Sequence, residues 1–231
     1  MSGYYYDNGR IEVTAIRTSR HNYINYVYLC NDKNTKEALL VDPAWDAKKI
    51  EECISKKGVH LKMILLTHTH EDHTNLAEYF AEKYDVAVHI SNEEIEYYNF
   101  NCKNIKGFVN EDIFFLNDIN IKCMLTPGHT VGSTCFFVDD VLFSGDTLFI
   151  EGCGSCEFAG GSKEQMYDSL LFLKERVFGE TKVFPGHKFK SDLGVSFDYV
   201  KENNIYFYST TKNQFIKMKE RYSKGKIING C

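Results

Sequence analysis

The sequence predicts an α/β fold of four layers, in which two layers of strands lie between layers of helices. Apolar segments of strand length, rich in Ile, Val, Tyr and Leu, alternate with amphipathic segments of helical length in the first half of the chain. A second run of strands joined by tight turns follows, and a further long amphipathic segment comes after it. Two runs of strands, each accompanied by helices, pack most simply as two sheets with helices outside.

The first run of strands alternates with two predicted helices. The expected strands cover residues 11–18, 23–30, 37–41, 61–66 and 86–90. Pro43 ends the third of them because proline cannot donate a hydrogen bond to a sheet. The first helix is expected over 46–57, with Asp46 as its N-cap and Gly58 after its last turn. The second helix is expected over 75–83.

The second run of strands covers residues 113–116, 121–126, 134–138, 141–144 and 182–184. Asp139 and Asp140 favour a hairpin turn between two of these strands. A helix is expected over 163–178, because one apolar stripe recurs there at helical spacing: Met166, Leu170, Leu173 and Val177. Two more helices, near 196–203 and 211–222, are expected to close the chain.

Length and composition predict a single domain over residues 1–231, with a short C-terminal helical extension over about 191–231. The chain has 43% hydrophobic and 26% charged residues, as globular proteins do. The formal net charge is −5 and no stripe of Lys or Arg is present. We therefore expect no nucleic-acid partner, because a polyphosphate backbone needs clustered positive charge.

The N-terminus and the cysteines indicate a cytoplasmic protein. Residues 1–10 are polar and rich in Tyr, unlike a secretory signal, and no apolar run approaches the ~18 residues that cross a bilayer. Several of the eight cysteines lie in apolar strands, where we expect buried, reduced thiols. Cys153 and Cys156 form a C-x-x-C pair, which we expect in a backbone turn rather than in a disulfide switch.

Five of the eight histidines follow predicted strands and form a candidate metal site: His68, His70, His73, His129 and His187. Neutral imidazole is the commonest metal ligand in proteins. A single histidine is usually a surface or core residue, but five of them at strand ends, together with Asp72, favour a metal site. His21, His60 and His89 lack this setting, and we expect them to be ordinary residues.

Four segments that follow one another along the chain carry a family resemblance. They are 67–73 (THTHEDH), 126–133 (TPGHTVGS), 145–149 (GDTLF) and 184–187 (FPGH). Over roughly residues 11–190, the chain resembles the metallo-β-lactamase superfamily, and most closely its glyoxalase II branch. The resemblance implies that the predicted sandwich is the αββα metallo-β-lactamase fold.

The resemblance also implies a site for two divalent metal ions. The seven implied ligands are His68, His70 and His129 for one ion, Asp72, His73 and His187 for the other, and Asp146 as the bridge between them. Asp146 separates the chain from the β-lactamases proper, which carry Cys or Ser there. Zinc is the expected metal, although histidine and carboxylate ligands also suit iron and manganese.

Such a site predicts hydrolysis. Two metals ~3.5–4 Å apart lower the pKa of a shared water towards ~7, so that a metal-bound hydroxide would be the nucleophile. Asp72 is the expected catalytic residue, which would orient the hydroxide and later receive its proton. A thiol leaving group with a pKa near ~8.5 needs little acid catalysis, and the motifs offer no dedicated acid. These features favour a thioester over an unactivated amide.

Two thioester substrates fit the resemblance. Glyoxalase II cleaves glutathione thioesters such as S-lactoylglutathione, and residues 145–154 resemble its sequence. However, Ser155 and Cys156 replace the basic residue that grips glutathione, and Lys217, Lys219 and Arg221 do not reproduce the basic residues of its C-terminal domain.

The zinc-dependent hydrolases of bacterial polyketide biosynthesis also resemble the chain. They have a similarly short C-terminus and act on acyl groups held by carrier proteins, and residues 194–207 are closer to theirs. We therefore predict a thioester substrate on a small molecule or a carrier protein, with an acyl carrier protein of polyketide biosynthesis as the first choice.

Two other functions remain as alternatives. Relatives with a similar histidine set oxidise persulfides with iron, and oxygen uptake on a persulfide would identify that activity. A non-catalytic scaffold is the other, but the intact ligand set argues against it because a scaffold needs no metal ligands.

Overall fold

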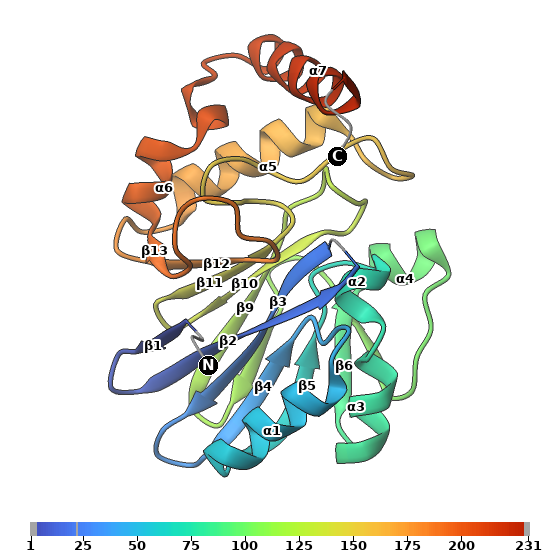
Figure 1. The fold of residues 1–231 in the computed structure, drawn as a ribbon, viewed down its shortest axis with the longest axis vertical. Coiled ribbons are helices and arrows are strands. Elements are labelled where there is room, and N and C mark those ends of the chain that lie inside the picture. Colours follow the sequence, from blue (N-terminus) through green and yellow to red (C-terminus); the bar gives the residue numbers. More distant parts are fainter. Residues whose placement is uncertain (1–3, 22, 229–231) are drawn as a thin grey trace.

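A computed structural model of the chain describes residues 4–21 and 23–228, with side chains as far as Arg221. Two β-sheets lie face to face, and helices cover the outer face of each (Figure 1). Three buried apolar clusters fill the spaces between successive layers, one between the sheets and one under each set of helices. The predicted four-layer αββα fold is therefore confirmed. No helix in the described part of the chain is long and apolar enough to cross a membrane.

The first sheet has seven strands, which lie side by side in the order of the sequence. They are β1 (Tyr5–Asp7), β2 (Ile11–Arg20), β3 (Tyr23–Asp32), β4 (Glu37–Val41), β5 (His60–Leu65), β6 (Ala87–Ser91) and β7 (Ile105–Phe108). Strands β1 to β4 pair antiparallel. Strands β4 to β7 pair parallel, since a helix lies in each connection between them.

Helices α1 (Ala47–Lys57) and α3 (Ala77–Tyr84) cover the outer face of this sheet. They bury an apolar cluster that includes Ile50, Ile54 and Phe80. The ends of α1 agree with their prediction. The Asp46 side chain accepts a hydrogen bond from the first turn at 3.0 Å, and Gly58 ends the helix at φ 61°.

Parts of the first half differ from the prediction. The helix expected over 75–83 corresponds to α3, and a short helix that was not predicted, α2 (Glu71–Thr74), precedes it. The two helices are separate because the N–H of Leu76 donates to the carbonyl of Pro43 instead of continuing α2. Helix α4 (Asn92–Tyr98) and strands β1 and β7 were not predicted. They span only three to seven residues, which is too few for a clear apolar period.

The second sheet has six strands in the order β13-β12-β11-β10-β9-β8. They are β8 (Ile113–Leu116), β9 (Ile119–Leu125), β10 (Thr134–Val138), β11 (Val141–Gly145), β12 (Lys182–Pro185) and the short, unpredicted β13 (Val195–Ser196). Strands β10 and β11 form the predicted hairpin, with Asp139 at φ 56° in its turn.

Four helical segments lie on the outer side of the second sheet (Figure 1). They are α5 (Lys163–Arg176), α6 (Phe197–Asn203), the 3-10 helix η1 (Ile205–Tyr208) and α7 (Lys212–Ile228), which lies beyond α5. The predicted stripe of α5 is buried, at Met166, Leu170, Leu173 and, just after the helix, Val177. The last three segments form the predicted C-terminal helical extension.

The two sheets approach closely at one edge. The N–H of Thr134 donates to the carbonyl of Thr67 at 2.9 Å, which joins the second sheet to the segment after β5. Gly145, at the end of β11, has φ 47°, and a side chain there would meet the Thr67 hydroxyl at 2.5 Å. Only glycine therefore allows β11 to end this close to the first sheet.

Candidate metal centre

The seven candidate ligands all follow strands that end at this edge. The segment 68–73 provides four of them, between the end of β5 and the short helix α2. His129, Asp146 and His187 follow β9, β11 and β12, which run in the same direction within the second sheet. The fold therefore brings together residues that lie far apart in the sequence.

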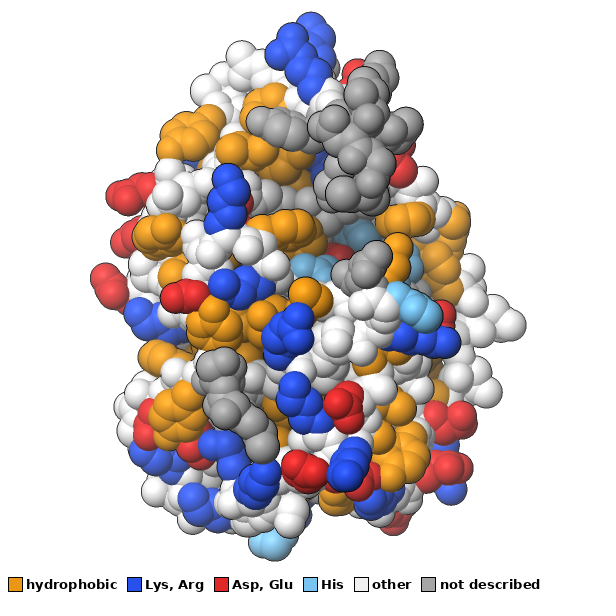
Figure 2. All heavy atoms as spheres, viewed as in Figure 1, with side chains coloured by type: hydrophobic (Ala, Val, Ile, Leu, Met, Phe, Trp, Pro, Cys, Tyr) orange, Lys and Arg blue, Asp and Glu red, His pale blue; other side chains and the backbone are white. Residues whose placement is uncertain are grey.

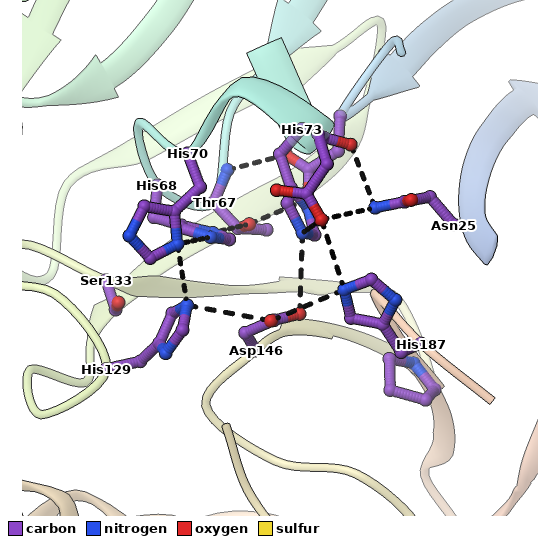
Figure 3. Close-up of polar contacts among 12 residues, drawn as sticks. Asn25, Thr67, His68, His70, His73, His129, Ser133, Asp146 and His187 are labelled. Carbon is purple, nitrogen blue, oxygen red and sulfur yellow. Dashed lines mark hydrogen bonds and ion pairs between the residues drawn. The ribbon is translucent and has the colours of Figure 1, made fainter. Parts of the chain in front are cut away.

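Three histidines form one half of the cluster (Figure 3). The Nδ1 atom of His70 lies 3.1 Å from Nε2 of His68 and 2.9 Å from Nε2 of His129. Burial lowers the pKa of His129 to about 4 and that of His68 well below its ordinary value. Both rings are therefore neutral at physiological pH, which is the form that binds a metal.

Asp72, His73 and His187 form the other half. Nε2 of His187 lies 3.4 Å from Oδ2 of Asp72, and Nε2 of His73 lies 3.7 Å from the same oxygen. Asp146 lies between the two halves: its Oδ1 is 3.5 Å from His73, and its Oδ2 is 3.6 Å from His129 and 3.5 Å from His187 (Figure 3).

Two buried atoms at the centre of the cluster fit a bound cation. Nε2 of His73 and Oδ1 of Asp146 have no hydrogen-bond partner among the described residues. Burial opposes ionisation of Asp146, but the neighbouring rings of His187 and His73 hold its pKa well below the ordinary value. The site therefore offers imidazole nitrogens and charged carboxylates, which are ligands of zinc, iron and manganese.

The charges of the site also favour cations. Burial would lower the pKa of His187, but the carboxylates of Asp146 and Asp72 outweigh it and raise this pKa to about 11. The negative charge that would hold a proton on His187 also attracts a divalent ion, which competes for the same lone pair.

Hydrogen bonds from the outer ring nitrogens fix the orientation of two candidate ligands. Nδ1 of His129 donates to the carbonyl of Ser155 at 2.6 Å, and Nδ1 of His187 donates to the carbonyl of Ile24 at 2.7 Å. Because a carbonyl can only accept, the neutral form of each ring has its Nε2 lone pair directed at the cluster.

Asp42 orients a third candidate ligand, His73, and this role was not predicted. Its Oδ2 atom accepts from Nδ1 of His73 at 2.9 Å and from the Thr67 hydroxyl at 2.7 Å, while its Oδ1 accepts from the Thr67 N–H at 2.8 Å. In the sequence, Asp42 directly precedes Pro43 at the end of a predicted strand and is not among the candidate ligands. A carboxylate next to a metal-binding histidine raises the basicity of the ring and fixes its tautomer.

Asn25 holds Asp72. Its amide donates to Oδ2 of Asp72 at 3.0 Å and to the Asp72 carbonyl at 2.9 Å. The indole of Trp45 donates to the Asn25 oxygen at 3.0 Å, which fixes the amide with its nitrogen towards Asp72. One oxygen of the Asp72 carboxylate is therefore held in place beside His187.

Glu94 is a second residue that the sequence did not reveal. This fully buried carboxylate lies in α4. It accepts from the N–H of Thr69 at 2.8 Å and the hydroxyl of Thr69 at 2.7 Å, and from the N–H of Gly132 at 2.8 Å. Glu94 thus ties the loop of His68 and His70 to the loop that follows His129.

Aromatic side chains flank the cluster on both sides. The ring of Phe158, which is 59% exposed, lies 5.4 Å from the ring of His70. On the other side, Phe149 lies 5.9 Å from His187 and 5.2 Å from Phe189, which is 56% exposed. Figure 2 shows histidine side chains open to this face of the molecule, with hydrophobic side chains beside them.

Residues set aside in the sequence lie outside the cluster. His21, His60 and His89 belong to none of the three groups of side chains that could hold a metal ion among the described residues. Cys153 and Cys156 are free thiols, as are the other cysteines in the described part of the chain. Cys231 lies outside the described residues.

Comparison with known proteins identifies the family. The sequence model of the metallo-beta-lactamase superfamily matches residues 21–187 of the chain. The chain is 36% identical to the probable polyketide biosynthesis zinc-dependent hydrolase PksB of Bacillus subtilis, over 94% of the chain and 97% of that protein. It is 39% identical to a human hydroxyacylglutathione hydrolase-like protein, over 71% of the chain and 56% of that longer protein.

A solved structure gives the same result for the fold. The crystal structure of ETHE1 from Myxococcus xanthus superimposes with a TM-score of 0.79 at 26% identity, and the match covers 89% of each chain. The chain belongs to the metallo-β-lactamase superfamily, as a metal-dependent hydrolase.

Proposed function

We propose that the chain is a binuclear metal-dependent hydrolase that cleaves thioesters, and that its substrates are acyl groups on an acyl carrier protein of polyketide biosynthesis. The observation that carries the hydrolytic part is the gathering of the seven candidate ligands around two buried atoms, Nε2 of His73 and Oδ1 of Asp146, that have no hydrogen-bond partner among the described residues. The polyketide part rests on the similarity to PksB over almost the whole chain.

Each half of the cluster would hold one ion, with Asp146 shared between them. Two divalent ions, when bound, lower the pKa of a water molecule and withdraw electrons from a carbonyl oxygen. The remaining chemistry belongs to the side chains, which must position the water, the substrate and the transferred protons.

Asp72 is suited to receive the proton of the attacking water. Its carboxylate lies at the open side of the cluster, with its side chain 24% exposed, and Asn25 holds one of its oxygens. The pKa of Asp72 lies below its ordinary value, since hydrogen bonding from His187 and the charge of His73 outweigh burial. Asp72 is therefore ionised at neutral pH and can accept a proton.

The leaving group favours a thioester. Water oxygen bonds to the carbonyl carbon, the C–S bond breaks, and the electron pair leaves with sulfur as a thiolate. Among the described residues outside the ligand set, the Asn25 amide donates to the side chain of Asp72, whereas the Thr67 hydroxyl donates to Asp42. Neither is a useful acid at neutral pH, whereas a thiol with a pKa of about 8.5 leaves without one.

The aromatic residues at the site suit an acyl chain. Phe158 and Phe189 are more than half exposed on either side of the cluster, where an apolar ligand would cover them. Burial of apolar area contributes about 25 cal/mol per Å², so covering such rings would add substantially to acyl-chain affinity.

Hydrolysis of glutathione thioesters is the second candidate, favoured by the similarity to the human hydroxyacylglutathione hydrolase-like protein. Of the C-terminal basic residues, Lys217 and Arg221 are exposed. Lys219 is 5% exposed, and its ammonium already donates to the carbonyl of Gly154. Its side chain is therefore not free to bind a glutathione carboxylate.

A substrate panel tests the proposal. Zinc-loaded protein should hydrolyse acyl-carrier-protein thioesters faster than acyl-CoA or S-lactoylglutathione. At saturating zinc, Asp72→Asn should lower kcat by about 10²- to 10⁴-fold, as loss of a general base does. Glu71→Gln is the matched control, because this neighbouring carboxylate is exposed and pairs only with Arg20 among the described residues. Unchanged turnover in Asp72→Asn, or oxygen uptake on a persulfide, would contradict the hydrolytic mechanism.

A further inference from the structure

Lys219 of α7 is buried, unlike the basic residues near it. Its side chain is 5% exposed, whereas Lys217 and Arg221 on the same helix are exposed. Burying an ammonium group is costly unless its hydrogen bonds are satisfied, so lysine is rarely found in such a place without a specific partner.

The partner of Lys219 is a backbone loop. Its Nζ donates to the carbonyl of Gly154 at 2.6 Å and lies 3.5 Å from the Cys153 sulfur. It also lies 5.2 Å from the centre of the Tyr206 ring, within range of a cation–π contact. The C-terminal extension thus places a positive charge against the C-x-x-C segment.

That loop touches two of the proposed metal ligands. The N–H of Gly154 donates to the carbonyl of Asp146 at 2.8 Å, and the carbonyl of Ser155 accepts from Nδ1 of His129 at 2.6 Å. A side chain at position 154 would meet the Asp146 carbonyl at 2.3 Å and His129 Nδ1 at 2.9 Å. The loop therefore packs directly on both ligands, and a shift of its backbone would move them.

Asn204 holds the beginning of the same loop. This fully buried residue, which follows α6, donates to the carbonyls of Phe149 at 2.9 Å and Gly152 at 2.8 Å. The extension therefore holds the loop through Asn204 at its start and through Lys219 at its centre.

We propose that Lys219 is a positioning residue of the metal centre. Its ammonium group holds the carbonyl of Gly154 and so fixes the backbone of the loop. The next carbonyl in that loop, at Ser155, accepts from His129 and sets the orientation of its ring. The C-terminal extension would then support the ion held by His68, His70 and His129. This inference rests on the ligand assignment of the proposed function, but not on the thioester substrate.

Zinc affinity tests the inference without any substrate. Lys219→Met keeps the length of the side chain and removes the donor, and Lys217→Met is the matched control on the exposed face of the helix. Competition with a chromophoric chelator should show one of two zinc ions bound about 10- to 100-fold more weakly in Lys219→Met, the usual effect of losing a residue that orients a ligand. Lys217→Met should bind both ions as the wild type does.

Two further variants keep the test decisive. Lys219→Gln retains a donor and should lose less zinc affinity than Lys219→Met. It also takes the place of Lys219→Met if that variant does not fold. Wild-type affinity for both ions in a folded Lys219 variant, even one with a lower Tm, would show that Lys219 stabilises the extension alone, and would overturn the inference. His129→Ala separates the two proposals: if it also binds both ions normally, the ligand assignment itself is wrong.

Discussion

Replacing Asp42 by asparagine should weaken metal binding although Asp42 is not a ligand. The buried Asp42 carboxylate accepts three hydrogen bonds, one from Nδ1 of His73 and two from Thr67. An asparagine amide has one oxygen and one NH₂ group, so at least one of these buried donors would face another donor. An unsatisfied buried group costs about 1–3 kcal/mol. At ~1.4 kcal/mol per tenfold change, and with the loss of the charge that orients His73, we expect zinc affinity to fall about 10- to 100-fold.

Asp46→Asn is the matched control for this experiment. Asp46 is the exposed N-cap of α1, and asparagine caps a helix as well as aspartate does, so neither stability nor affinity should change. Zinc affinity is measured by chelator competition, and folding by circular dichroism. If Asp42→Asn folds and binds zinc as tightly as Asp46→Asn does, the orientation of His73 by Asp42 does not matter for the site, and the reasoning fails.

The remaining predictions concern the bridge, the acyl contact, the metal and the core. Asp146→Asn should weaken the binding of both zinc ions, and weaker binding of only one ion would show that Asp146 does not bridge them. Phe158→Ala should raise KM for long acyl thioesters with little change in kcat, and an unchanged KM would remove Phe158 from the acyl site. Each zinc ion at 100 times its Kd should stabilise the fold by ~2.7 kcal/mol, seen as a Tm that a chelator lowers; a chelator-insensitive Tm would contradict this. Met166→Ala should cost about 2–5 kcal/mol in urea unfolding, against ~0.5 kcal/mol or less for the exposed Leu171→Ala, and equal costs would contradict the packing of α5.

The elements that could be predicted are those whose signals are local. Helix α1 begins after an N-cap aspartate and ends at a glycine, and both signals lie next to the helix that they delimit. The candidate ligands could be named because each follows a strand in a short motif. What the motifs could not show is distance: Nε2 of His129 and Nδ1 of His70 are 2.9 Å apart, yet the residues are separated by 59 positions.

The supporting residues could not be predicted because their partners are remote in the sequence. Glu94 lies in a short helix without a clear apolar period, and its buried carboxylate is satisfied only once the loops of Thr69 and Gly132 meet. In the sequence, Lys219 is one of several basic residues in a polar predicted helix. Its burial and its bond to Gly154, 65 residues away, appear only when α7 packs against α5.

The seven-ligand centre is tested most directly by anomalous diffraction from crystals of the zinc-loaded protein. We expect two zinc peaks, one among His68, His70 and His129 and the other among Asp72, His73 and His187, with the Asp146 carboxylate between them. A single peak, or peaks away from these side chains, would contradict the binuclear site on which the proposed hydrolysis depends.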